Sequence, residues 1–195
     1  MHTYNEYQLN KSIITICEGP SESAYLMEVN KVFREEGIKT SFIPRISASG
    51  HFLAIKQKFS LERKNNKSTE IIIWADNDIY KRNDSNNEVK YNSKQGLPDF
   101  KFNYYNFEDM LILHMDDNLI ATWQNICLTK KHFTSPLSSD VHEKLFKENI
   151  CPEYQKGTIP IENFSLNIIK KAIKNNNNKD ILFKSDFLFY LEKLI

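Results

Sequence analysis

The sequence predicts an α/β fold built on a mainly parallel sheet of about four strands. Two apolar runs, residues 12–17 and 70–75, are short, continuous and rich in β-branched residues. Such runs are typical of strands that are buried on both faces of a parallel sheet. Apolar residues at helical spacing lie between the runs, and this strand–helix alternation favours right-handed βαβ connections.

The first half of the chain is interpreted element by element. A strand over residues 12–17 is followed by a helix over 20–36, because Pro20 suits a first helical turn and Gly37 suits the position after a helix. The apolar residues of this helix recur at helical spacing: Tyr25, Leu26, Val29, Val32 and Phe33. A second strand over 40–46, a helix over 51–64 and a third strand over 70–75 follow.

The second half is expected to be mainly helical. After a long polar segment, residues 100–105 form a short fourth strand. The helices are then predicted over residues 107–115, 119–128, 141–147, 161–174 and 184–194. The Asn175–Asn178 run is expected to be a loop. We expect a single domain with a core over residues 1–135 and a C-terminal helical flank over 136–195 that packs on it.

Composition narrows the classes of function. The 195 residues include 26 basic and 25 acidic ones, so any nucleic-acid binding requires a local basic patch rather than a global field. Cys17, Cys127 and Cys151 are far apart, which argues against a zinc ribbon and favours reduced thiols in a cytoplasmic protein. No apolar stretch approaches the roughly 18–20 residues that a membrane span needs.

Carboxylates follow two of the expected strands. Glu18 comes directly after the first, and Asp76 and Asp78 end the third. Because ligands bind at the carboxyl edge of open α/β sheets, we expect the two strands to be neighbours and their acids to converge. Close carboxylates repel one another unless a divalent cation lies between them. This pattern predicts a Mg²⁺ (or Mn²⁺) site for phosphoryl transfer. The alternative is that each acid is an ordinary turn residue.

The order of these motifs resembles a known family. Glu18-Gly19-x-x-Glu22 after a strand, followed by a helix, a strand and Asp76-x-Asp78, is similar to the TOPRIM fold of topoisomerases, primases and OLD-type nucleases. The RloB-like branch is the closer resemblance, because Tyr25 extends the first motif and the run 106–114 contains Asn-Phe-Glu and a final His. That run is two residues shorter after its Asn than the family pattern. The segment Tyr154-Gln155-Lys156-Gly157 is similar to the family's Tyr-Lys-Lys segment.

The resemblance implies a TOPRIM-like, Rossmann-like core with the activity of a metal-dependent nuclease. Glu18 would be the general acid/base or a metal ligand, and Asp76 and Asp78 would hold magnesium. Glu22 is either a dipole partner of its helix or part of the site. Glu108, otherwise an ordinary helix-start acid, becomes a catalytic candidate through the resemblance.

Three further residues are candidate contacts to a substrate. His114 lies six positions after Glu108 and therefore cannot share its helical face, so it is a structural histidine or a substrate contact. Lys130 and Lys131 are candidate phosphate contacts, although short charge runs are usually solvated faces.

The favoured hypothesis is hydrolysis of a phosphodiester in DNA or RNA, possibly tRNA, by an effector of bacterial anti-phage defence that acts through abortive infection. The resemblance implies an SMC-like or ABC-type ATPase partner, and the chain has no Walker-type phosphate loop with which to bind ATP itself. One alternative is a non-catalytic subunit of an ATPase complex that binds metal or nucleic acid. The other is a small-molecule phosphatase, which would need a nucleophilic Asp where Glu18 stands.

Overall fold

A sheet of four parallel strands forms the centre of the computed structural model, which describes residues 11–49, 52–77 and 100–195. The strand order is β2-β1-β3-β4. The strands are β1 (Lys11–Cys17), β2 (Thr40–Ile46), β3 (Glu70–Asp76) and β4 (Phe100–Asn103). Every pairing is parallel, which confirms the predicted α/β class. The predicted adjacency of the strands that precede Glu18 and end at Asp76 is also confirmed, because β1 pairs with β3.

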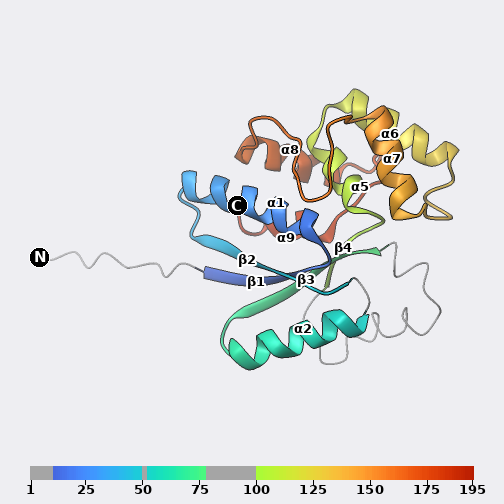
Figure 1. Cartoon of the computed structure of the whole chain (residues 1–195). Coiled ribbons are helices and arrows are strands. Elements are labelled where there is room, and N and C mark those ends of the chain that lie inside the picture. The colour runs from blue at the N-terminus through green and yellow to red at the C-terminus, as the bar shows by residue number, and fades with distance from the viewer. Residues whose placement is uncertain (1–10, 50–51, 78–99) are drawn as a thin grey trace, which may run out of the picture.

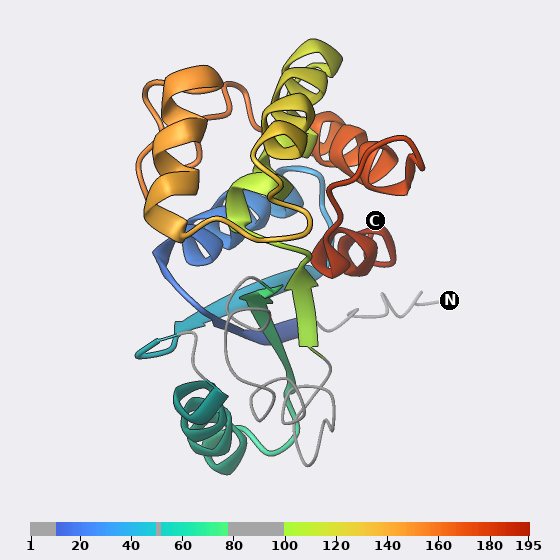
Figure 2. The same cartoon turned by 90° about the vertical axis from the view of Figure 1, so that its right-hand side faces the viewer.

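Helices cover both faces of the sheet, but unequally. Among the described helices, α2 lies alone on one face, and the others gather on the opposite face (Figures 1 and 2). The helices are α1 (Pro20–Glu35), α2 (Phe52–Asn65), α5 (Phe107–Leu111), α6 (Asp117–Thr129), α7 (Ser139–Asn149), α8 (Leu166–Asn177) and α9 (Asp186–Glu192), with a 3-10 turn, η1 (Ile112–His114). None of these helices combines the length and the apolar character that crossing a membrane requires.

The strands alternate between two hydrophobic clusters, as period-two geometry dictates. In β1, Ile13 and Cys17 join the cluster under α1, and Ile14 and Ile16 join the one under α2. In β3, Trp74 faces the α1 side. Burial on both faces explains why these strands are continuous apolar runs rather than alternating ones.

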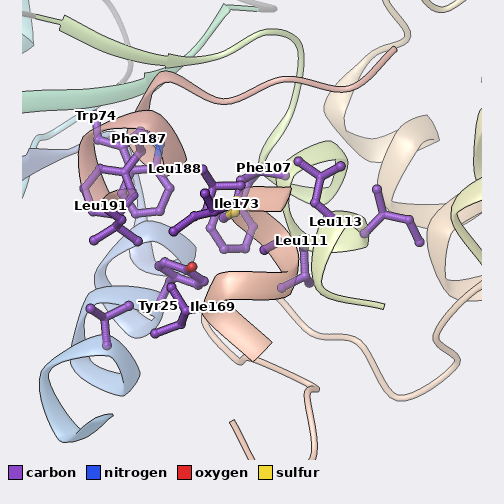
Figure 3. Close-up of a cluster of buried hydrophobic side chains, with 14 of the residues drawn as sticks. Tyr25, Trp74, Phe107, Leu111, Leu113, Ile169, Ile173, Phe187, Leu188 and Leu191 are labelled. Atoms are coloured by element: carbon purple, nitrogen blue, oxygen red, sulfur yellow. The ribbon is translucent and has the colours of Figure 1, made fainter. Parts of the chain in front are cut away.

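The larger cluster joins the C-terminal helices to the sheet (Figure 3). Phe187 of α9 stacks on Trp74 of β3 with ring centroids 4.0 Å apart. Tyr25 of α1 is fully buried and meets both rings edge-on, so it is part of the core. The other four apolar residues predicted for this helix face are buried as well. All three cysteines are free thiols, as predicted, and all three are buried.

Several predicted element boundaries were wrong. The fourth strand ends at Asn103, because the next backbone N–H, that of Tyr104, donates to the Lys184 carbonyl instead of extending the ladder. The helix predicted over 107–115 tightens into η1 at Ile112, and the one predicted from 161 begins only at Leu166.

The polar run at the end of α8 was also misassigned. Asn175, Asn176 and Asn177 form the last turn of α8 rather than a loop. The Asn175 amide donates to the Leu113 carbonyl, and the Asn176 side chain bonds both backbone groups of Ser185. These buried amides therefore tie α8 to η1 and to the start of α9.

Candidate functional site

A cavity of about 200 Å³ lies at the carboxyl edge of the sheet. It is formed by the end of β1, the start of α1, the end of β3, the start of α5, the first residue of α7 and the segment after α7. Its acidic lining residues are Glu18, Glu22, Asp76 and Glu108, and its basic one is Lys156. The two strand ends and the first turns of α1 and α5 thus bring four of the predicted site residues to one place.

Glu18 and Asp76 are held directly against each other. The backbone N–H of Asp76 donates to Glu18 Oε2 at 2.9 Å. The Asp76 carboxylate accepts from the Asn103 amide at 2.9 Å and from the Phe107 N–H at 3.1 Å. These contacts fix both acids to neighbouring strands and to the start of α5, so the cavity is anchored to the rigid part of the fold.

The start of α1 supplies the second side of the cavity. Glu22 Oε2 accepts from the Gly19 N–H at 3.0 Å, so this acid caps its own helix while it lines the cavity. Ser21 Oγ accepts from the Gly157 N–H at 3.1 Å. Gly157 has a φ of 85°, a left-handed conformation that favours glycine. This turn places Lys156 at the cavity, where its ammonium lies 3.5 Å from Glu143.

Glu108 reaches the cavity from a buried position. Only 5% of the residue is exposed. The Tyr154 hydroxyl donates to Glu108 Oε1 at 2.9 Å, and His142 Nδ1 lies 3.5 Å from Oε2. Burial and the nearby Glu108 charge raise the pKa of Tyr154, which keeps its hydroxyl a donor.

The next residue, Asp109, is a second buried carboxylate, and each of its two oxygens accepts two hydrogen bonds. Its Oδ1 accepts from Trp123 Nε1 at 2.8 Å and from His142 Nε2 at 3.1 Å. Its Oδ2 accepts from His132 Nε2 at 3.0 Å and from the Asn106 N–H at 3.2 Å. These four donors match the four lone-pair sites of a carboxylate.

The electrostatics of this network are set by opposite charges. Burial raises the pKa of the Asp109 carboxyl, but the His142 charge and the hydrogen bonds of His132 and His142 outweigh it and hold that pKa below its usual range. Burial lowers the pKa of His142, but Asp109 outweighs it and raises the pKa well above its usual value. The favoured state is therefore an imidazolium beside an ionised carboxylate.

Asp109, His132 and His142 carry metal-binding atoms within 4.8 Å of one another. The Leu137 N–H, however, donates to His132 Nδ1 at 3.1 Å, so Nδ1 carries the lone pair and Nε2 the proton. A neutral imidazole that binds a metal through Nε2 has its proton on Nδ1, and that proton would here face another donor. We therefore interpret this group as a hydrogen-bonded network rather than a metal centre.

The cavity suits a different kind of ion. In the described ranges, no three of its carboxylates have oxygens as close together as the Asp109 group. Magnesium keeps several of its waters and is commonly bound by one or two carboxylates together with substrate phosphates. The carboxylates of Glu18, Glu22, Asp76 and Glu108 could therefore hold a magnesium ion that keeps several of its waters. They do not form a site in which protein ligands alone would surround the ion.

Three of the four other predicted site residues lie away from the cavity. Asp78 is outside the described residues. His114 is buried, with its Nε2 2.8 Å from the Tyr25 hydroxyl, and it does not line the cavity. Lys130 and Lys131 are exposed just after α6 and do not line it either.

The structure adds residues that the site prediction did not include. Asn106, Ser139 and Lys156 line the cavity, and His142 contacts Glu108 from the core side. Asn106 and Lys156 lie within the two segments that resemble the family, 106–114 and 154–157, so the resemblance could have indicated both as site residues. His142 had none, because nothing in its spacing connects it to residue 108.

Comparisons with models of protein families, with curated proteins and with solved structures found no significant match to this chain.

Proposed function

We propose that the chain is a TOPRIM-like, RloB-like metal-dependent nuclease that hydrolyses phosphodiesters in DNA or RNA. The observation that carries the proposal is the shared cavity of Glu18, Asp76 and Glu108 at the carboxyl edge of the parallel sheet. Ligand sites of open α/β sheets lie at this edge. We further propose that an ATPase partner controls the activity in an anti-phage system.

Each residue has a role that follows from its position. Glu18 and Asp76, on neighbouring strands, would hold Mg²⁺ or Mn²⁺, which supplies Lewis-acid charge and a more acidic bound water. Glu108, held by Tyr154, lines the same cavity from the start of α5. It can orient a water or accept its proton there.

Lys156 is the proposed phosphate contact in place of Lys130 and Lys131. It lines the cavity, whereas the other two lysines do not. The Gly157 turn on Ser21 fixes the backbone next to it, and its ammonium lies 3.5 Å from Glu143. A cation among these acids offsets the repulsion that a phosphate anion would otherwise meet.

The test compares cleavage of DNA and of total tRNA by the purified chain, with Mg²⁺ or Mn²⁺ and with and without a candidate ATPase. Glu18→Gln is the informative variant, because its amide oxygen can still accept from the Asp76 N–H while the charge is lost. Glu28→Gln, on the α1 helix that follows Glu18 and paired with Lys31, is the matched control.

We expect cleavage by the wild type and Glu28→Gln, and loss of cleavage in Glu18→Gln and in EDTA. Full activity of Glu18→Gln would refute the assigned site. Metal-dependent nucleic-acid binding without cleavage under any condition would replace the nuclease by the alternative, a non-catalytic subunit of an ATPase complex.

A further inference from the structure

Two buried side chains contact the carboxylate of Glu108, one of the four cavity acids. Tyr154, 1% exposed, donates to Oε1. His142, fully buried, faces Oε2. Because both contacts come from the core, they leave the cavity side of the carboxylate for a ligand.

His142 Nδ1 lies near an acceptor on Glu108 but beyond ordinary hydrogen-bond length. Within the described ranges this nitrogen is buried and makes no hydrogen bond, and Glu108 Oε2 lies 3.5 Å from it. A movement of about 0.5 Å would bring the pair to ordinary hydrogen-bond length. Contacts of this kind are often long in free enzymes and tighten when the ligand binds.

The opposite nitrogen of His142 is fixed. Its Nε2 donates to Asp109 Oδ1 at 3.1 Å, and Asp109 is held in turn by Trp123 and His132. Trp123 also packs edge-on against the His142 ring, with centroids 5.0 Å apart. The imidazole therefore has little freedom to turn away from Glu108.

From this geometry we propose that His142 is a positioning residue that orients the Glu108 carboxylate toward the ion in the acidic cavity, with Asp109 as its anchor. The inference rests on the proposed function, because it assumes that Glu108 serves that ion. His142 itself does not touch the cavity.

The chain permits a reciprocal pair of variants. An asparagine amide nitrogen is as many bonds from Cβ as histidine Nδ1, and a glutamine amide nitrogen is as many as Nε2. His142→Gln therefore keeps a donor for Asp109 and loses the one for Glu108, while His142→Asn does the opposite. His132→Gln is the matched control, since His132 is equally buried and, among the described residues, contacts Asp109 but not Glu108.

The measured quantity is the Mn²⁺ affinity of the full purified chain, by paramagnetic resonance or calorimetry, together with the melting temperature. Loss of a residue that orients a metal ligand typically weakens metal affinity by about 10–100-fold, and we expect a loss in this range for His142→Gln. His132→Gln should keep near wild-type affinity even where its melting temperature falls. His142→Asn keeps the donor for Glu108 but loses the anchor, so it should lose less affinity than His142→Gln.

The outcomes separate the two proposals. Wild-type affinity in His142→Gln, or affinities that follow melting temperature across the three variants, would overturn the positioning role alone. Absence of Mn²⁺ binding in the wild type, or unchanged binding in Glu18→Gln, would overturn both this role and the proposed metal site.

Discussion

Acid should destabilise this protein through one buried histidine, His114. Its Nδ1 lies 3.2 Å from the Leu111 carbonyl, which can only accept, so Nδ1 carries the proton. Its Nε2 then accepts from the Tyr25 hydroxyl at 2.8 Å. The ring also stacks on Phe164, with centroids 5.9 Å apart. Burial in these surroundings lowers the pKa of His114 from 6.5 to about 4.

The size and sign of the effect follow from proton linkage. Below pH 6.5 the unfolded chain binds a proton at His114 that the folded chain does not take up until about pH 4. The free energy of unfolding therefore falls as the pH drops through this window and is unaffected by His114 above it. At about 1.4 kcal/mol per pKa unit, the full shift is worth about 3 kcal/mol.

Urea denaturation at pH 7 and at pH 4 would measure this loss. His114→Gln removes the titrating ring. Between pH 7 and pH 4 the wild type should therefore lose about 3 kcal/mol more free energy of unfolding than this variant loses. For a chain of this size that equals about 6–12 °C in relative melting temperature.

Tyr25→Phe is the control for this experiment. It removes the hydrogen bond to Nε2 but leaves the imidazole buried, so its acid response should parallel that of the wild type. If His114→Gln and the wild type instead lose stability in parallel to within about 1 kcal/mol, burial does not depress this pKa and the reasoning fails.

Three further substitutions test other parts of the structure. Asp109→Asn should lower the free energy of unfolding by about 3–5 kcal/mol, because it leaves buried donors without their charge partner; a loss below about 1 kcal/mol in chemical denaturation would contradict this. Lys156→Met should weaken nucleic-acid binding and reduce the slope of log K against log salt by about 1, while Lys144→Met on α7 should change neither. Equal slopes for Lys156→Met and the wild type in a salt titration would show that Lys156 does not contact the substrate phosphate. Phe187→Ala should cost about 3–5 kcal/mol, because it removes the ring stacked on Trp74; a midpoint close to wild type would show that α9 does not need this stack.

The sheet and the acids at its edge could be predicted because they depend on local patterns. Continuous β-branched runs over β1 and β3 indicate strands buried on both faces, and their parallel order follows from the helices that connect consecutive strands, α1 and α2. Once the two strands are neighbours, the acids that follow them must share an edge. The placement of Glu18 beside Asp76 therefore needed no knowledge of tertiary packing.

The rest of the site depends on contacts that leave no periodic signal. The network of Asp109, His132 and His142 joins three segments that are distant in the sequence, and each residue alone resembles an ordinary surface polar residue. Asn175 and Asn176 were misassigned for the same reason, because their buried partners, not their helix propensity, keep them helical. Tertiary hydrogen bonds overrode local preference in both cases.

The position of the Asp109 network bears on why the chain keeps it. A buried ion pair commonly stabilises a fold no better than well-packed apolar residues of the same volume. Stability alone therefore gives little reason to bury Asp109 with His142. Both His142 and Tyr154, however, end on the same carboxylate, Glu108, and that carboxylate lines the acidic cavity. A network that only stabilises packing has no reason to contact Glu108. A network that orients a carboxylate lining the cavity must contact that carboxylate.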